Sequence, residues 1–322
     1  MSLLSDLFNF LKKPNQQKIT NNDHYDNFWQ VLKLISISVF TGITLSLLAN
    51  FVFNKTFSLP SSSIQITEMA KTVQIWQAIF TITILAPTIE ELCFRFVASR
   101  KSEDFFFGLG FMFIFFFSLI SEIIARNTGN FFGIKNLNSF QAYLIYLFGM
   151  MIILILTQIN YQKISAKTEK WLAKKQTLPI IIYSSSLLFA LAHLSNYKTL
   201  DWKISFLIIT QFLLGLIYSY TRIKLGFWLA VVCHIGYNSV LIILLAMPQL
   251  ILEKLNQITN ITNLQTFTQV FTELPLYNQI LLTITIFCLF SLYITIISFF
   301  VQTLVEFFGS KNPKRQLGLD KN

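Results

Sequence analysis

The sequence predicts an all-α membrane protein, a polytopic bundle of about eight transmembrane helices. Apolar residues make up 54% of the 322 residues, whereas charged residues make up only 12%. Soluble domains carry about 25% charged residues, so this chain has too little polar surface to cover a soluble globule. The apolar residues gather in eight long runs without the period-two alternation of membrane β-strands. A lipid bilayer is therefore the expected environment, and a nucleic-acid partner is excluded.

The predicted spans follow from length, because about 20 apolar residues cross a bilayer and the usual range is about 17 to 25. They divide the chain into a polar N-terminal tail (1–29), a transmembrane bundle (30–308) and a basic C-terminal tail (309–322). The eight spans are Leu34–Phe53, Val73–Ala98, Phe105–Ile124, Phe140–Ile159, Leu178–Leu194, Ile204–Tyr220, Leu225–Ala246 and Ile280–Phe300.

The N-terminal tail contains a short apolar patch, Leu3–Leu11, with helical spacing of its leucines. Two interpretations stay open: an interfacial amphipathic helix or a disordered segment. The cysteines Cys93, Cys233 and Cys288 all lie in apolar runs and form no CxxC motif, so the sequence supports no disulfide framework and no structural zinc site.

Basic residues decide the predicted orientation. With eight spans both termini lie on the same side, and that side receives 16 of the 23 Lys and Arg residues in loops and tails. Five lysines of the loop 163–175 belong to this set. Because cytoplasmic loops are enriched in Lys and Arg, both termini are predicted to face the cytoplasm. The expected location is the plasma membrane of a bacterium.

Ionisable side chains interrupt the second predicted span. Glu90, Glu91 and Arg95 lie in an otherwise apolar helix, where each charge costs several kcal/mol. Glu91 and Arg95 are four residues apart and can pair on one helix face, in the bidentate arrangement that arginine forms with carboxylates. Glu90 is rotated by about 100° from that face. A desolvated carboxyl group of this kind is a candidate general base.

Two histidines lie in other spans: His193 in the fifth, and His234 in the seventh, with Asn238 four residues later. The i, i+4 spacing places the imidazole of His234 and the amide of Asn238 on one helix face. Uncharged donors of this type are suited to hold a developing oxyanion. The six residues Glu90, Glu91, Arg95, His193, His234 and Asn238 are the candidate catalytic set.

The ordered motifs Glu-Glu-x-x-x-Arg, Phe-x-x-x-His and His-x-x-x-Asn resemble those of the CPBP group of intramembrane endopeptidases. This group comprises the CAAX prenyl proteases and the bacteriocin-processing or self-immunity (Abi) proteins. The first motif lies at Glu90, Glu91 and Arg95, the second at Phe189 and His193, and the third at His234 and Asn238. The resemblance covers about residues 73–246. Phe96 follows Arg95 where the family often has glycine.

The resemblance implies a helical bundle whose polar site opens toward the cytoplasm and the lipid. Glu90 together with His193 would activate a water that attacks a peptide carbonyl. His234 and Asn238 would hold the oxyanion, and Glu91 and Arg95 would orient the site. The implied substrate is a membrane-associated peptide or protein. In a bacterium, a leader peptide or toxin precursor is a more natural target than a prenylated CAAX tail.

Three other functions are compatible with the same residues. Glu90, Glu91, His193 and His234 include zinc-ligand types, which would suit a metal-dependent protease, although no HExxH motif is present. A non-catalytic immunity or scaffold protein could keep the same polar core. A transporter could use the residues as a proton relay, but no inverted repeat is visible. No cofactor is expected, zinc is the minority alternative, and the sequence does not predict an oligomeric state.

Overall fold

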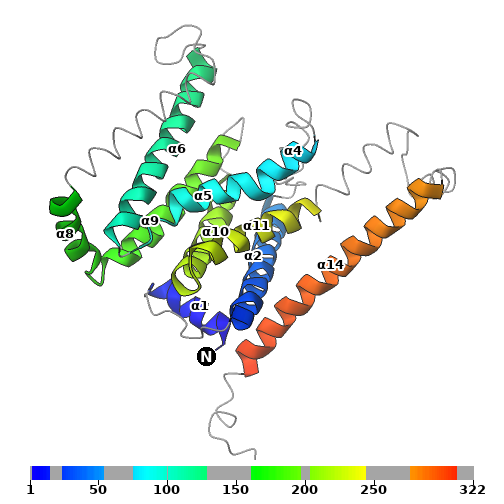
Figure 1. Cartoon of the computed structure of the whole chain (residues 1–322). Helices are drawn as coiled ribbons and strands as arrows, with labels where there is room; N and C mark the ends of the chain where they lie inside the picture. The colour runs from blue at the N-terminus through cyan, green and yellow to red at the C-terminus, as the bar shows by residue number, and fades with distance from the viewer. Residues whose placement is uncertain are drawn as a thin grey trace, which may run out of the picture. The chain divides into compact units, whose positions relative to one another are not determined.

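The structure is a computed structural model of the whole chain, and it describes residues 2–14, 24–53, 75–99, 101–128, 161–196, 204–243 and 276–309. Every regular element within these ranges is helical (Figure 1). The elements are α1 (Leu3–Lys12), α2 (His24–Phe53), α4 (Ile75–Phe80), the π-helical turn η1 (Thr81–Leu85), α5 (Ala86–Phe94), α6 (Ser102–Thr128), α8 (Tyr161–Leu172), α9 (Thr177–Ala192), the 3₁₀ turn η2 (His193–Asn196), α10 (Ile204–Lys224), α11 (Phe227–Leu241) and α14 (Leu276–Gly309).

The helical fold class is confirmed for the described residues, and five predicted spans correspond to single helices: α2, α6, α9, α10 and α14. By length and hydropathy, the segments Asp26–Leu45 and Phe290–Gly309 can cross a membrane. A third candidate is the pair Ser165–Leu172 and Thr177–Ala192, which is bent by 93°. The span predicted over Phe140–Ile159 lies outside the described residues, and the total of eight spans stays a prediction.

Two predicted spans have different structures from those expected. The run Val73–Ala98 is interrupted by η1, and its helix ends at Phe94, so Arg95 begins a turn instead of lying inside the helix. The run Leu225–Ala246 contains α11, which is only 15 residues long. Gly226, with a φ of 112°, separates α11 from α10. A glycine adopts this backbone conformation without steric cost, which explains why α10 ends before it.

Pro87 accounts for the interruption of the second run. A proline inside a helix has no N–H, and its ring clashes with the carbonyl group four residues earlier, which here belongs to Thr83. The chain responds by widening the preceding turn: the Ala86 N–H bonds to the Thr81 carbonyl, five residues back, as in a π-helix. The α-helix then resumes as α5, with Pro87 in its first turn.

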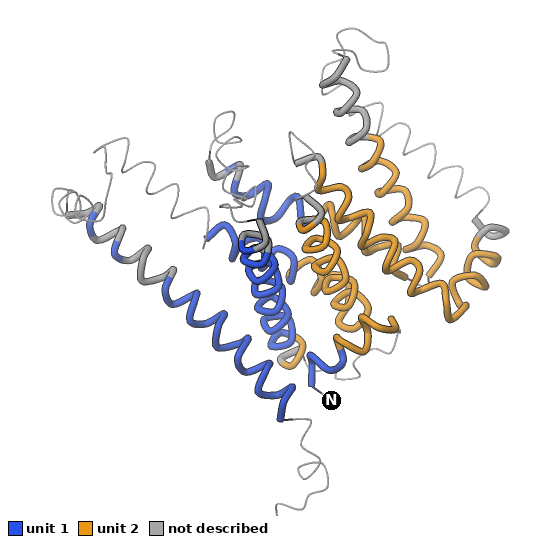
Figure 2. Tube along the Cα trace, turned by 180° about the vertical axis from the view of Figure 1, so that it is seen from behind, with its two compact units in different colours: residues 1–6, 28–87, 233–322 blue, residues 7–27, 88–232 orange. Residues whose placement is uncertain are grey.

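The chain forms two compact units (Figure 2). The first unit comprises Met1–Asp6, Phe28–Pro87 and Cys233–Asn322, and the second comprises Leu7–Asn27 and Thr88–Val232. In the first unit α2 packs on α14 through two aromatic contacts, Trp29 with Phe299 and Phe40 with Phe300, whose ring centroids are 5.4 and 4.0 Å apart. These contacts hold together the two helices that qualify best as membrane spans.

In the second unit α9 and α10 are neighbours. The C-terminal part of α1 packs against both of them. Phe10 of α1 is buried and packs edge-on against Tyr220, and the Tyr183 hydroxyl donates a hydrogen bond to the Leu11 carbonyl at 2.7 Å. Of the two interpretations of Leu3–Leu11, a helix or a disordered segment, the structure shows a helix. Its residues Leu7 and Phe10 are buried in protein.

Large apolar side chains remain exposed on the described helices. Examples are Phe51, Phe113, Phe290 and Val305, which lie on α2, α6 and α14. An apolar surface of this kind is costly in water but suits contact with lipid. The surface chemistry of the helices therefore agrees with the composition of the chain.

Candidate active site

A carboxylate and a guanidinium lie completely buried at the end of α5. Glu91 and Arg95 both have a side-chain exposure of 0%, and Arg95 Nε lies 3.6 Å from Glu91 Oε1. The Arg95 N–H still bonds to the Glu91 carbonyl, so the i, i+4 relation predicted from the sequence is kept although α5 has ended. The side-chain contact is too long for a hydrogen bond. The predicted bidentate arrangement is therefore wrong, and the two groups form an ion pair through Nε.

The guanidinium of Arg95 is surrounded by three aromatic rings, which we call the arginine cage. Its Cζ lies 4.2 Å from the ring centroid of Phe189, 5.6 Å from that of Tyr218 and 6.0 Å from that of Phe94. Among the described residues, Nη1 and Nη2 have no hydrogen-bond partner. Attraction between a desolvated cation and the faces of aromatic rings, about 2 kcal/mol in favourable cases, partly replaces the missing hydrogen bonds.

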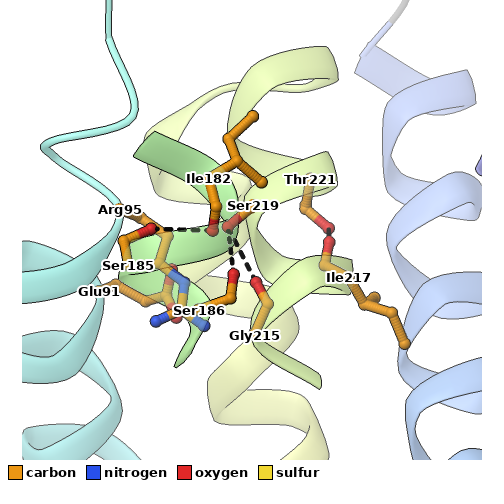
Figure 3. Close-up of polar contacts among 9 residues, drawn as sticks. All are labelled: Glu91, Arg95, Ile182, Ser185, Ser186, Gly215, Ile217, Ser219 and Thr221. Carbon is orange, nitrogen blue, oxygen red and sulfur yellow. Dashed lines mark hydrogen bonds and ion pairs between the residues drawn. The ribbon is translucent and has the colours of Figure 1, made fainter. Parts of the chain in front are cut away.

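Small residues of α9 and α10 leave room for the guanidinium (Figure 3). Ser186 of α9 faces Ser219 of α10, with hydroxyl oxygens 3.4 Å apart, and Ser219 donates to the Gly215 carbonyl at 2.9 Å. A Cβ atom added at Gly215 would lie 3.2 Å from Arg95 Nη2 and 3.1 Å from Ser186 Cβ. Small side chains let helices approach closely, and here they also admit the Arg95 side chain between them.

His193 caps the C-terminus of α9 and adjoins the arginine cage. Its backbone N–H bonds to the carbonyl groups of Ala190 and Leu191, and its Nδ1 lies 2.8 Å from the Phe189 carbonyl. Because a carbonyl group only accepts hydrogen bonds, Nδ1 carries a proton, and in the neutral form of the ring Nε2 is the acceptor. The imidazole packs edge-on against the Phe189 ring, with centroids 4.6 Å apart. Phe189 thus contacts both Arg95 and His193.

Glu90 and Glu91 differ in environment although they are adjacent on α5. Glu90 is half-buried, whereas Glu91 is fully buried. This difference follows from the 100° rotation between successive residues of a helix. The accessible carboxyl group is the one that can meet a water molecule or a substrate.

The remaining two candidates lie on α11 in the first unit. His234 is buried, with 3% exposure, and Asn238 is half-buried. The Asn238 Nδ2 donates a hydrogen bond of 3.0 Å to the Ile82 carbonyl in η1. Glu90, Glu91, Arg95 and His193 lie in the second unit, where the arginine cage connects α5 with α9.

The residues of α10 that surround Arg95 were not predicted from the sequence. Tyr218 and Gly215 complete the surroundings of Arg95, and a signal for them was present as Gly215 and Ser219, a small-x-x-x-small pair in an apolar run. Phe96, the residue after Arg95, packs edge-on against Phe227 at 4.7 Å.

Within the part of the chain that the structure describes, no three His, Cys, Asp or Glu side chains are grouped as metal ligands would be. Two of the candidate residues instead form an ion pair, Glu91–Arg95, inside an aromatic cage, next to the imidazole of a third, His193. In a chain with apolar helix surfaces, ionisable groups at this degree of burial define a membrane protein with a polar interior site.

Comparison with protein families identifies the group. The family model described as type II CAAX prenyl endopeptidase Rce1-like matches residues 72–240, which is 169 of the 322 residues. The chain therefore belongs to the Rce1-like family, a branch of the CPBP proteases, and the resemblance predicted from the three motifs is confirmed. This family consists of membrane-embedded proteases. Comparisons with curated proteins and with solved structures give no match.

Proposed function

We propose that this protein is an intramembrane endopeptidase of the CAAX type that hydrolyses a peptide bond with water activated by Glu90 and His193. The substrate is a membrane-associated peptide or protein, and no metal ion takes part. The contact of Phe189 with both Arg95 and His193 is the observation that carries the proposal. It joins the first two motifs of the family in one packed arrangement.

The proposed steps assign one role to each candidate residue. The Glu90 carboxylate accepts a proton from water, and His193 Nε2 accepts the hydrogen bond that orients this water. The resulting hydroxide attacks the carbonyl carbon of the scissile bond. His234, and the amide N–H of Asn238 that does not bond to Ile82, donate to the oxyanion. Glu90 then returns its proton to the leaving amine. The Glu91–Arg95 pair holds the end of α5 in position.

The first prediction concerns Glu90. Glu90→Gln keeps the shape of the side chain and removes the base, so cleavage falls by about 10²- to 10⁴-fold. The assay follows cleavage by the purified, membrane-reconstituted protein, with and without EDTA, by mass spectrometry. The probes are a prenylated CAAX peptide and a membrane-inserted leader peptide. The control is Glu103→Gln, which changes an exposed carboxyl group at the start of α6.

The alternatives give different outcomes in the same assay. Wild-type activity that is lost with EDTA supports a metal-dependent protease. Glu90→Gln with unchanged turnover excludes Glu90 as the base. A folded wild-type protein that cleaves neither probe, yet gives a cellular phenotype that persists in Glu90→Gln, supports a non-catalytic immunity or scaffold function.

The second prediction concerns location and orientation. We propose that the chain is an integral protein of a bacterial plasma membrane with both termini in the cytoplasm, because 16 of the 23 basic residues in loops and tails fall on one side. A cysteine introduced at Lys167, an exposed residue of α8, is then protected from a membrane-impermeant thiol reagent in intact cells. A cysteine at Asn260 is labelled. Labelling of the Lys167 position from outside contradicts the orientation.

A further inference from the structure

The π-helical turn η1 contains a carbonyl group that the helix itself cannot satisfy. In a regular α-helix the Ile82 carbonyl accepts from the N–H of residue 86, and in a π-helix it accepts from the N–H of residue 87. The Ala86 N–H bonds to the Thr81 carbonyl instead. Residue 87 is proline and has no N–H. Both helical donors of Ile82 are thus removed, one by the wide turn and the other by the proline ring.

The side chain of Asn238 supplies the missing donor. Its Nδ2 lies 3.0 Å from the Ile82 carbonyl oxygen, although the two residues are 156 positions apart in the chain. A carbonyl oxygen only accepts, so the amide nitrogen of Asn238 must face it. A half-buried backbone carbonyl group left without a partner is costly, and the cost rises as the surroundings become less polar. The bond is partly buried and lies within the first unit.

We infer that Asn238 is a positioning residue, which caps the carbonyl group orphaned by Pro87 and so fixes the wide turn from which the helix of Glu90 begins. This inference rests on the proposed function, because it concerns the helix that carries the proposed base. The oxyanion role proposed for Asn238 uses the other N–H of the same amide. The His-x-x-x-Asn motif then has two functions at its last residue.

The structural consequence concerns the angular phase of α5. A π-turn holds one residue more than an α-turn, so each side chain after the turn is rotated by about 100° relative to a continuous α-helix. Pro87 prevents the regular turn, and the Asn238 bond stabilises the wide one. Glu90 and Glu91 follow in the next turn of the same helix.

The test is a double-mutant cycle on the full-length protein in detergent. It compares the wild type, Asn238→Leu, Pro87→Ala and the double variant by Tm and by amide hydrogen exchange. Leucine has a similar shape and no donor. Asn238→Leu is expected to lower the Tm by about 2 to 8 °C and to speed amide hydrogen exchange of residues 81–88 roughly tenfold. Gln302→Leu, which changes an exposed amide of α14, is the control and leaves both quantities unchanged. Exchange in 81–88 that stays as in the wild type overturns the inference.

The double variant separates capping from general packing. Pro87→Ala restores an N–H, so Ile82 gains a backbone donor in either helix register and no longer needs Asn238. Asn238→Leu is then expected to cost less than a third of its original Tm shift when Pro87→Ala is present. Equal shifts in both backgrounds overturn the inference.

If Asn238→Leu alone fails to fold, recovery of folded protein in the double variant supports the inference. Continued failure of the double variant, with a folded Pro87→Ala, overturns it. If Pro87→Ala fails to fold, amide hydrogen exchange of residues 81–88 is compared between the wild type and the variants Asn238→Leu and Asn238→Asp, which both lack the amide donor. Faster exchange in both variants supports the inference, and exchange as in the wild type overturns it.

Cleavage provides the readout that a merely structural bond would not change. Part of the activity lost per folded molecule in Asn238→Leu returns in the double variant if Asn238 positions α5. No activity returns if its only role is oxyanion donation, and this result overturns the positioning role. The stability and exchange cycle needs no substrate. A wild-type protein without cleavage would therefore contradict the proposed function and leave the carbonyl cap open to test.

Discussion

The described part of the first unit contains the ion pair Lys33–Glu306, and that of the second contains Glu91–Arg95 and Arg222–Asp104. Of these, Lys33–Glu306 and Glu91–Arg95 have the shortest and the longest contact. In the second unit Glu91 and Arg95 are fully buried, yet their closest atoms are 3.6 Å apart. In the first unit Lys33 Nζ lies only 2.6 Å from Glu306 Oε1, although the side chains are 14% and 39% exposed. The shorter contact is thus the more exposed one. Distance alone is therefore a poor guide to what each pair contributes.

The degree of burial, and not the distance, decides how much each pair affects the stability of the fold. Moving two charges out of water costs several kcal/mol for each ion, and their attraction repays this cost only partly. The Lys33–Glu306 pair is partly buried: Lys33 is largely covered, but Glu306 keeps access to its surroundings, so the pair loses less on separation than a fully buried one. The Glu91–Arg95 pair cannot separate without leaving a bare charge among the rings of the arginine cage. We therefore regard the fully buried pair as a geometric element of the proposed site and the partly buried pair as a local contact between α2 and α14.

The largest expected effect comes from removing one member of the buried pair. Glu91→Gln leaves the Arg95 guanidinium buried without its counter-charge and is expected to lower the free energy of unfolding by about 3–5 kcal/mol. Thermal unfolding in detergent, followed by far-UV circular dichroism, measures the loss. Glu103→Gln serves as the control because its carboxyl group is exposed. A loss no larger than that of the control would contradict the role assigned to burial.

A smaller effect is expected from crowding the arginine cage. In Gly215→Ala the new Cβ lies 3.2 Å from Arg95 Nη2 and 3.1 Å from Ser186 Cβ, so the guanidinium or α9 must shift. Overpacking of this kind costs about 1–3 kcal/mol. Gly110→Ala of α6 is the matched control, since its Cβ meets no described atom within 4 Å and alanine favours the helix. Both variants are compared by Tm and by cleavage per folded molecule. Equal behaviour of the two variants shows that the cage does not constrain Arg95.

The same comparison shows which features can be predicted from sequence. The helices and the Glu91–Arg95 pairing were predictable because they depend on local spacing: apolar run length and an i, i+4 relation. The arginine cage was not, since Phe189 and Tyr218 reach Arg95 from two other helices and their contact depends on how those helices pack. The break at η1 had a local signal in Pro87, but the partner of the freed carbonyl group, Asn238, is 156 residues away from Ile82.

The smallest expected effect comes from breaking the partly buried pair Lys33–Glu306. Lys33→Met keeps most of the apolar stem of the side chain and removes the ammonium group, which donates to Glu306 at 2.6 Å. Glu306 is 39% exposed and lies three residues before the end of α14, so its carboxylate keeps access to polar surroundings. The expected loss in the free energy of unfolding is at most about 1 kcal/mol, and it shrinks further at high salt. Tm values of Lys33→Met, Glu306→Gln and the double variant, each at low and high salt, give the coupling between the two groups. A coupling as large as the loss in Glu91→Gln would show that burial is not what distinguishes the pairs, because a separation of 2.6 Å would then outweigh complete desolvation.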